Sequence, residues 1–148
     1  MPPILIDTNV LVYLYDTASP GKAAQAHRVM ERLEQTRSGR LSVQCMAEFV
    51  HTTTRKLDPP LSYAEALVQV GLLARMWPVF DLTPLIVLEA ARGARDHGLP
   101  YYDAQIWAAA RLNQVTTVFS EDFSDGQVLE GVRFANPFSL LFRVEDWA

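Results

Sequence analysis

Short runs of apolar and β-branched residues recur along the sequence, and segments with a helical pattern separate them. Three runs are clear and two are weaker: residues 2–6, 40–44 and 116–120, then 78–82 and 132–136. Runs of this length suit strands that are covered on both faces, as in a parallel sheet. Their alternation with helices predicts an α/β fold with a mainly parallel central sheet flanked by helices.

The intervening segments carry helix signals. Residues 22–38 have apolar side chains at helical spacing, and Gly39 stands where a C-cap is expected. Ser62 and Glu65 form the pattern of a capping box ahead of another helix. Two further helices are expected, from Thr83-Pro84 to near Gly98 and from Ala104 to Leu112.

The chain is long enough to fold as one unit without a covalent cross-link. With 148 residues it can bury roughly 70% of the surface of its unfolded form, and no repeat or linker divides it. We therefore expect a single domain over residues 1–148. No apolar run approaches the roughly 18 residues of a membrane span, the first residues lack signal-peptide features, and Cys45 is the only cysteine. These features predict a cytoplasmic protein with no membrane association.

Acidic residues stand where predicted strands give way to helices. Asp7 directly follows the first strand in ILIDTN, and Asp122 follows the strand at 116–120 in SEDFSDG. Glu48 falls in the first turn or so of the helix after the second strand, and Asp103 opens a later helix. Because sites in open α/β sheets form outside the carboxyl ends of the strands, these four acids are expected to converge.

Each acid has a simpler interpretation on its own. Asp7 or Asp103 alone is more often a helix cap, Glu48 alone is more often a solvated charge, and Asp122 or Asp125 beside a glycine is more often part of a turn. The set favours a functional site. Glu48 lies among apolar neighbours, where an unpaired charge would be costly.

Carboxylates held together need protons, a basic partner or a divalent cation. An oxygen-only ligand set suits Mg²⁺ or Mn²⁺, and the three histidines are not paired at the spacing of a zinc site. The sequence has neither a dinucleotide-binding glycine pattern nor a P-loop. A metal ion among carboxylates favours hydrolysis of a phosphodiester.

The net charge of −4 equals the charge of the four proposed site acids, so the rest of the chain is balanced. Of the 13 basic residues, 11 are arginines, which bind phosphate well. Arg55 and Lys56 follow Glu48 on the same predicted helix and are candidates to contact an RNA backbone. The alternative is a solvated helix face.

The stretch ILIDTNVLVYLYD resembles the opening of a PIN domain, and Glu48, Asp103 and the SED of Ser120 to Asp122 fall at that family's later acidic positions. The set is similar to VapC-type ribonuclease toxins of toxin–antitoxin pairs. This resemblance implies a three-layer PIN-like fold and a Mg²⁺- or Mn²⁺-dependent endoribonuclease. It also implies a frequent homodimer and a cognate antitoxin that inhibits the enzyme.

The resemblance implies roles for individual residues as well. Asp7 and Asp103 would be the chief metal ligands, and Glu48 and Asp122 would complete the catalytic set. Supporting roles would fall to Thr8 or Asn9 beside the first acid and to Ser120 beside the last. Glu121 and Asp125 are also available at the fourth position, where the [ST]-x-D spacing of the family favours Asp122.

Other classes remain open. A haloacid-dehalogenase-like phosphatase would need a second acid where Asn9 stands, and a receiver domain would need a late lysine, whereas only Lys22 and Lys56 are present. A PIN-fold binding module that acts through a protein partner without cleaving RNA is the main alternative.

Apolar residues near the C-terminus, in NPFSLLF, together with Trp77, Trp107 and Trp147, supply more apolar surface than a small core clearly needs. We expect them to form an interface for a homodimer and an antitoxin, with core packing as the alternative.

Overall fold

A six-stranded sheet in the order β3-β2-β1-β4-β6-β5 forms the centre of the computed structural model, which describes residues 1–148. The strands are β1 (Ile4–Ile6), β2 (Gly39–Ser42), β3 (Val79–Phe80), β4 (Thr117–Phe119), β5 (Val128–Leu129) and β6 (Val132–Ala135). All neighbouring pairs are parallel except β5 and β6. The predicted α/β fold with a mainly parallel sheet is confirmed.

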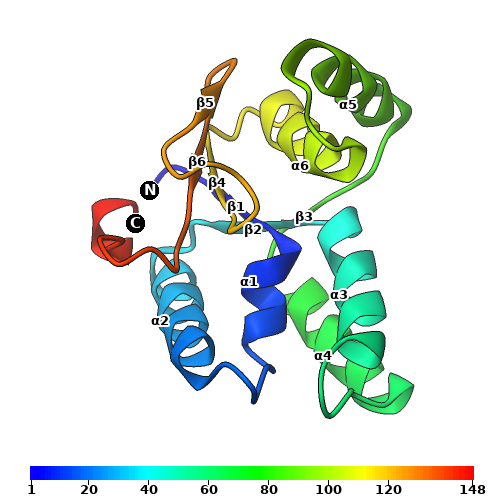
Figure 1. Ribbon diagram of the computed structural model, residues 1–148, viewed down its shortest axis with the longest axis vertical. Coiled ribbons are helices and arrows are strands. Elements are labelled where there is room, and N and C mark those ends of the chain that lie inside the picture. Colours follow the sequence, from blue (N-terminus) through cyan, green and yellow to red (C-terminus); the bar gives the residue numbers. More distant parts are fainter.

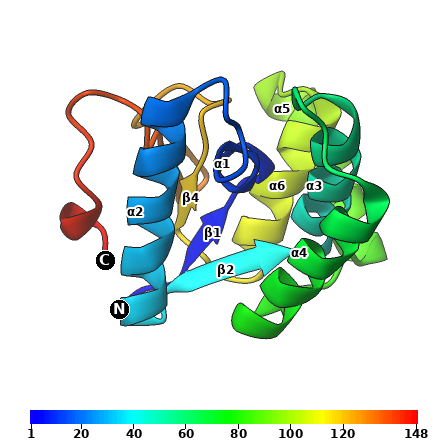
Figure 2. The same cartoon turned by 90° about the horizontal axis from the view of Figure 1, so that it is seen from below.

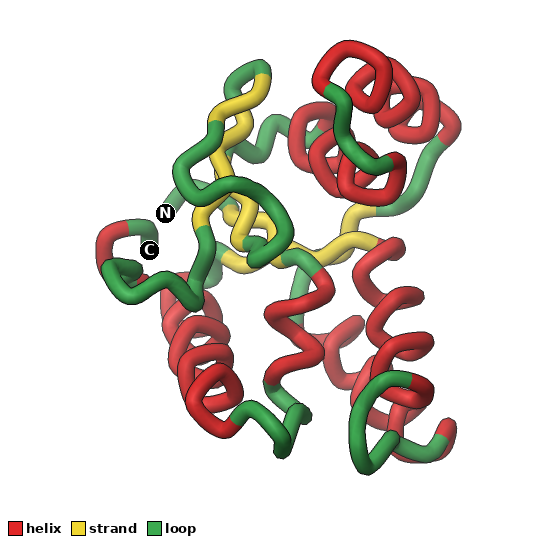
Figure 3. The backbone as a smooth tube through the Cα atoms, viewed as in Figure 1, coloured by secondary structure: helices red, strands yellow, loops and turns green.

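Six α-helices flank this sheet and make three layers. They are α1 (Thr8–Tyr13), α2 (Pro20–Thr36), α3 (Val43–Arg55), α4 (Tyr63–Met76), α5 (Pro84–His97) and α6 (Tyr101–Leu112), followed by a short 3₁₀ helix, η1 (Val144–Asp146). In Figure 1, α1 to α4 lie on one side of the sheet and α5 and α6 on the other. The strands are short beside the helices and loops, as Figure 3 shows. None of the helices combines the length and the apolar character that crossing a membrane requires.

The order of the strands reverses direction at β1. From β1 the chain moves outward to β2 and β3, and then returns through α5 and α6 to place β4 on the other side of β1. The carboxyl ends of β1 and β4 lie together, because Ile6 pairs with Phe119 and the Asp7 amide donates to the Phe119 oxygen at 3.0 Å. Figure 2 shows β1 leading into α1 at this end of the sheet. Such a switch point is where open α/β sheets bind their ligands.

Most predicted elements are present, with shifted bounds. The capping box at Ser62 and Glu65 is confirmed, as is the helix from Thr83 to Gly98. The prediction that Gly39 is a C-cap is wrong. Arg37 takes the left-handed C-cap conformation with φ 56°, and Gly39 begins β2, where the Trp77 ring fills the space that a Cβ would need. The two-residue strand β5 was not predicted.

The prediction that the tryptophans form an interface is wrong for two of them. Trp77 and Trp107 are buried, and each packs where a glycine leaves room, Trp77 over Gly39 and Trp107 over Gly93. Trp147 is half-buried and packs against the core. In NPFSLLF the fully exposed apolar side chains are those of Leu140 and Leu141.

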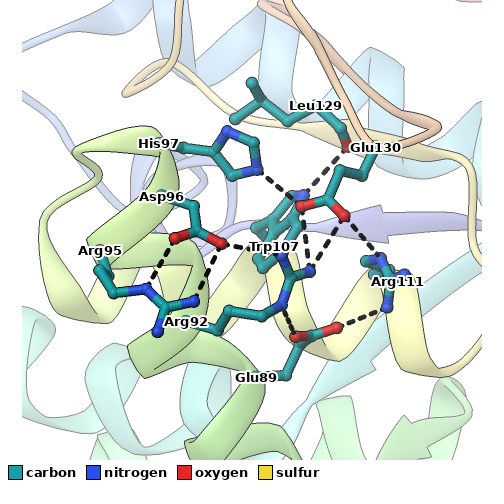
Figure 4. Close-up of polar contacts among 9 residues, drawn as sticks. All are labelled: Glu89, Arg92, Arg95, Asp96, His97, Trp107, Arg111, Leu129 and Glu130. Carbon is teal, nitrogen blue, oxygen red and sulfur yellow. Dashed lines mark hydrogen bonds and ion pairs between the residues drawn. The ribbon is translucent and has the colours of Figure 1, made fainter.

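A group of charged residues joins α5 and α6 to the turn between β5 and β6 (Figure 4). We call it the charged cluster: Glu89, Arg92, Arg95, Asp96, His97, Arg111 and Glu130. Arg92 donates to both carboxylate oxygens of Glu130 at 3.0 Å, and His97 Nε2 lies 2.7 Å from the same carboxylate. Glu130 has φ 47°, a left-handed conformation that costs energy for this residue type, and these ion pairs offset the strain.

Candidate functional site

Asp7 lies at the switch point, buried between β1 and α1. Its Oδ1 accepts a hydrogen bond from the Thr8 amide at 2.7 Å, and its Oδ2 accepts one from Ser120 Oγ at 2.7 Å. The side chain is 3% exposed. Burial raises the pKa of Asp7 to about 7, against the opposing effect of these hydrogen bonds, and the charges of Asp122 and Glu48 raise it further.

Asn9 and Ser120 connect Asp7 to Asp122. Asn9 Nδ2 lies 3.4 Å from Asp7 Oδ2 and donates to Asp122 Oδ2 at 3.1 Å. The Asp122 amide donates to Ser120 Oγ at 3.0 Å, and the Glu121 amide donates to Asn9 Oδ1 at 3.2 Å. The ends of β1 and β4 thus hold the two aspartates side by side.

Glu48 faces the same place from α3, which begins at Val43. It lies in the second turn of the helix, where the sequence predicted the first turn or so. Its Oε2 accepts a hydrogen bond from Thr8 Oγ1 at 2.8 Å, and its Oε1 accepts one from Gln44 Nε2 at 2.8 Å. Thr8 therefore contacts two acids, Asp7 through its amide and Glu48 through its hydroxyl.

Asp103 lies half-buried in the first turn of α6, and its carboxylate accepts no hydrogen bond from the protein. A helix cap would show such a bond, so the arrangement gives no support to a capping role. Burial raises the pKa of Asp103, and the charges of Asp122 and Glu48 raise it further. The negative charges of the other acids therefore act on Asp103, although no hydrogen bond connects its side chain to theirs.

The other two late acids have partners of their own. Glu121 accepts a hydrogen bond from Tyr13 Oη at 2.7 Å and forms an ion pair with Lys22. Asp125 Oδ1 accepts a hydrogen bond from the Asn136 amide at 2.9 Å. Of the three late carboxylates, only that of Asp122 belongs to the hydrogen-bond network of Asp7, which Glu121 joins through its backbone amide.

A groove of about 320 Å³ opens beside these acids. Its lining residues include Thr8, Asn9, Glu48, Asp122 and Lys56. Arg55, the last residue of α3, is exposed and does not line the groove. The groove is therefore lined by one basic side chain, by two of the four acids, and by two polar residues that contact those acids.

The four acids suit a hard divalent cation. No three acidic, histidine or cysteine side chains converge closely enough to ligate one ion directly. Mg²⁺ does not need such a nest, because it usually binds through one or two carboxylates and keeps several water ligands. None of the four acids has an ion pair with Lys, Arg or His. Their mutual repulsion can therefore be relieved by protons or by a divalent cation.

Sequence reasoning missed the polar residues behind the acids. Gln44 is 8% exposed and Gln105 is 5% exposed, and they bond to each other between α3 and α6. Two signals were available: Gln44 stands four residues before Glu48, on the same helix face, and Gln105 interrupts an otherwise apolar run in AQIWAAA.

Comparisons with known proteins agree with this architecture. The PIN domain family model matches residues 4–124. A toxin–antitoxin complex from Klebsiella pneumoniae has a TM-score of 0.67 at 16% identity over 93% of this chain and 99% of that chain. VapC20 of Mycobacterium tuberculosis, described as a toxin that cleaves the sarcin–ricin loop, has a TM-score of 0.64 at 20% identity over 88% and 98% of the two chains.

A DNA-bound VapBC from Salmonella typhimurium has a TM-score of 0.66 at 17% identity over 93% of this chain and 99% of that chain. No curated protein sequence gives a significant match. Likeness at these identities shows the fold, whereas the family model covers most of the sequence, from β1 through the loop after β4. On the strength of that match, this chain belongs to the PIN-domain family.

Proposed function

We propose that this protein is a Mg²⁺- or Mn²⁺-dependent endoribonuclease, the VapC-type toxin of a toxin–antitoxin pair, working as a single domain over residues 1–148 in the cytoplasm. One observation carries the proposal. Thr8, Asn9 and Ser120 gather Asp7, Glu48 and Asp122 at the switch point of the sheet, and no basic side chain pairs with them.

The proposed chemistry divides between the cation and the chain. When bound, the cation supplies an activated water and neutralises charge on the phosphodiester. Asp7, Glu48, Asp103 and Asp122 are the side chains that would hold it. The hydroxyl of Ser120 and the amide of Thr8 keep the Asp7 carboxylate in one orientation.

RNA would enter along the groove, where the ammonium group of Lys56 is positioned to contact a backbone phosphate. Arg55 would act farther out, on the exposed end of α3. Cleavage of this kind leaves 5′-phosphate and 3′-hydroxyl ends. The proposal predicts internal cuts in RNA and not stepwise removal of nucleotides.

Two protein partners belong to the proposal, a cognate antitoxin and a second copy of the chain. The structural relatives described as toxin–antitoxin complexes support the first. Exposed apolar side chains support the use of α4 and α5 as contact surfaces: Leu67, Val68 and Met76 on α4, and Leu85 and Leu88 on α5. Apolar side chains exposed together on a helix are candidates for an interaction site.

A PIN-fold binding module without cleavage activity is the alternative, and a single experiment separates the two. Purified protein is incubated with RNA and Mn²⁺, with EDTA as the metal-free control. We expect cleavage that EDTA stops, and a loss of at least about 100-fold in Asp7→Asn, since the cation contributes several kcal/mol to such reactions. Asp96→Asn, in the charged cluster, is the matched control and should cleave normally. A wild-type protein that binds Mn²⁺ and leaves RNA intact would establish the binding module.

A further inference from the structure

Buried amide groups form a chain that leads from the first turn of α6 to Glu48. Tyr101 Oη donates to Gln105 Oε1 at 2.9 Å, and Gln105 Nε2 donates to Gln44 Oε1 at 2.8 Å. Gln44 Nε2 then donates to Glu48 Oε1 at 2.8 Å and to the backbone oxygen of Tyr102 at 2.9 Å. Both amide hydrogens and the carbonyl oxygen of Gln44 are thereby used.

The acceptors at one end determine which group donates and which accepts in each of these hydrogen bonds. A backbone carbonyl can only accept, so Gln44 must turn its NH₂ group toward the Tyr102 oxygen, and the same NH₂ group donates to Glu48. Its oxygen then faces Gln105, which must present its own NH₂ group, and Tyr101 must donate its hydroxyl hydrogen. Rotating either side-chain amide by 180° would bring two donors or two acceptors together in buried surroundings, which is unfavourable.

This series of hydrogen bonds crosses from one helical layer of the fold to the other. In Figure 1, α3 and α6 lie on opposite sides of the sheet, and Gln44 bonds to both. On α3 it holds Glu48, and on α6 it holds Tyr102, the residue directly before Asp103. A single side chain therefore sets how two of the four acids lie relative to each other.

We propose that Gln44, supported by Gln105 and Tyr101, is a positioning residue that fixes Glu48 and the start of α6 in the geometry that binds the divalent cation. The inference rests on the proposed cation-dependent function. Gln44 touches neither the RNA nor the cation. It acts on Glu48 through a hydrogen bond and on Asp103 through the backbone of Tyr102. Residues that orient metal ligands in this way change metal affinity by roughly 10- to 100-fold when they are replaced.

The test compares Gln44→Leu, Gln105→Leu and Gln69→Leu with the wild type. Tyr15 Oη donates to Gln69 Oε1 at 2.6 Å, and Gln69 forms no hydrogen bond with any of the four acids, so its replacement also removes a glutamine–tyrosine hydrogen bond and serves as the matched control. Each protein is melted in EDTA and then across a series of Mn²⁺ concentrations. The readout is the Mn²⁺ concentration that gives half of that protein's own thermal stabilisation.

We expect Gln44→Leu to raise this concentration by roughly 10- to 100-fold and Gln105→Leu to raise it by a smaller factor. Gln69→Leu should lower the melting temperature in EDTA and leave the Mn²⁺ dependence unchanged. The Mn²⁺ dependence of RNA cleavage should shift in the same order. If Gln44→Leu does not fold, Gln105→Leu decides the question, since it loosens the Gln44 amide without removing it.

Two negative results are distinguishable. If the wild type responds to Mn²⁺ and both Gln44→Leu and Gln105→Leu respond just as it does, the positioning role of Gln44 is wrong while the proposed function stands. If the wild type gains no stability from Mn²⁺ and cleaves no RNA, the proposed function is wrong, and the role of Gln44 is wrong with it.

Discussion

Two groups of acidic residues in this molecule have opposite electrostatic surroundings. In the charged cluster, hydrogen bonds from Arg92 to Glu89 and from His97 to Glu130 hold the pKa values of these carboxyls below their usual range. At the switch point, burial raises the pKa values of Asp7 and Asp103, and neighbouring acids raise them further.

The difference separates acids whose charge stabilises the fold from acids whose charge the protein leaves without a basic partner. The acids of the charged cluster are neutralised by the protein itself, and they tie the hairpin of β5 and β6 to α5 and α6. The acids at the switch point receive neutral donors such as the Ser120 hydroxyl and the Asn9 amide, which orient a carboxylate without cancelling its charge. Such acids remain able to bind a cation.

The largest effect expected from this contrast concerns two adjacent residues. Asp122 belongs to the network of Asp7, whereas Glu121 is paired with Lys22. Asp122→Asn should reduce Mn²⁺-dependent RNA cleavage by roughly 100-fold or more, since it weakens the cation site, while Glu121→Gln should change it only a few-fold. Asp125→Asn is a second control. Initial cleavage rates at saturating Mn²⁺ measure the effect, and equal losses at Asp122 and Asp125 would show that both line the site.

The second effect is a dependence of stability on pH. Asp7 has a pKa of about 7 in the folded protein against 3.8 for the unfolded chain, so the folded state holds this proton more tightly. Protonated Asp7 therefore adds to the free energy of unfolding. This contribution is complete below about pH 4, falls as pH rises toward 7, and is absent above pH 7. It amounts to at most about 4 kcal/mol.

Urea unfolding in EDTA across this pH range measures that dependence. The wild type should lose free energy of unfolding between about pH 4 and pH 7, and Asp7→Asn should show a flatter profile, since it has no proton to release. A variant with the same slope as the wild type would assign the pH dependence to other groups.

A smaller effect distinguishes a cation ligand from a helix cap at Asp103. In EDTA, Asp103→Asn should raise the melting temperature by a few degrees because it removes a charge that the other acids repel. It should also reduce the gain from Mn²⁺, which for the wild type reaches about 2.7 kcal/mol at a hundred times Kd. A mutant that melts below the wild type in EDTA, with an unchanged response to Mn²⁺, would identify a cap.

The smallest effect lies in the charged cluster. Glu130→Gln should lower the melting temperature by a few degrees at low salt, because Arg92 and His97 lose the carboxylate that they share. The loss should shrink in 1 M NaCl, which screens ion pairs at the surface. RNA cleavage by the folded variant should equal that of the wild type, and a large loss of cleavage would mean that the cluster and the site are coupled.

The sequence predicted the α/β architecture because strand-forming runs and helical patterns are local properties of the chain. It also identified Asp7, Glu48, Asp103 and Asp122 as candidates, since each stands near a strand-to-helix transition and the spacing is that of a known family. These signals do not depend on how distant segments pack. The roles of the four acids in cleavage remain predictions.

The sequence could not predict contacts whose partners are far apart in the chain. Trp77 was expected at an interface, with core packing as the alternative, because nothing nearby in the sequence shows that Gly39 leaves room for its ring. The hydrogen bond from Gln105 to Gln44 joins residues 61 positions apart, and no local pattern pairs them. No pattern around Glu130 in the sequence predicts its left-handed conformation or its ion pair with Arg92 of α5.

The pairing of β1 with β4 also bears on how the protein is made. Ser120 Oγ and Asp7, which it orients, are 113 residues apart in the sequence. A ribosome adding about 5–20 residues per second therefore needs roughly 6 to 23 seconds after synthesising Asp7 before it can supply Ser120. During that interval β1 lacks one of its two neighbouring strands, and the acids have no common edge on which to gather. A growing chain therefore cannot assemble the acidic set at the switch point until about four-fifths of it has been translated, since Ser120 and Asp122 lie that far along its 148 residues.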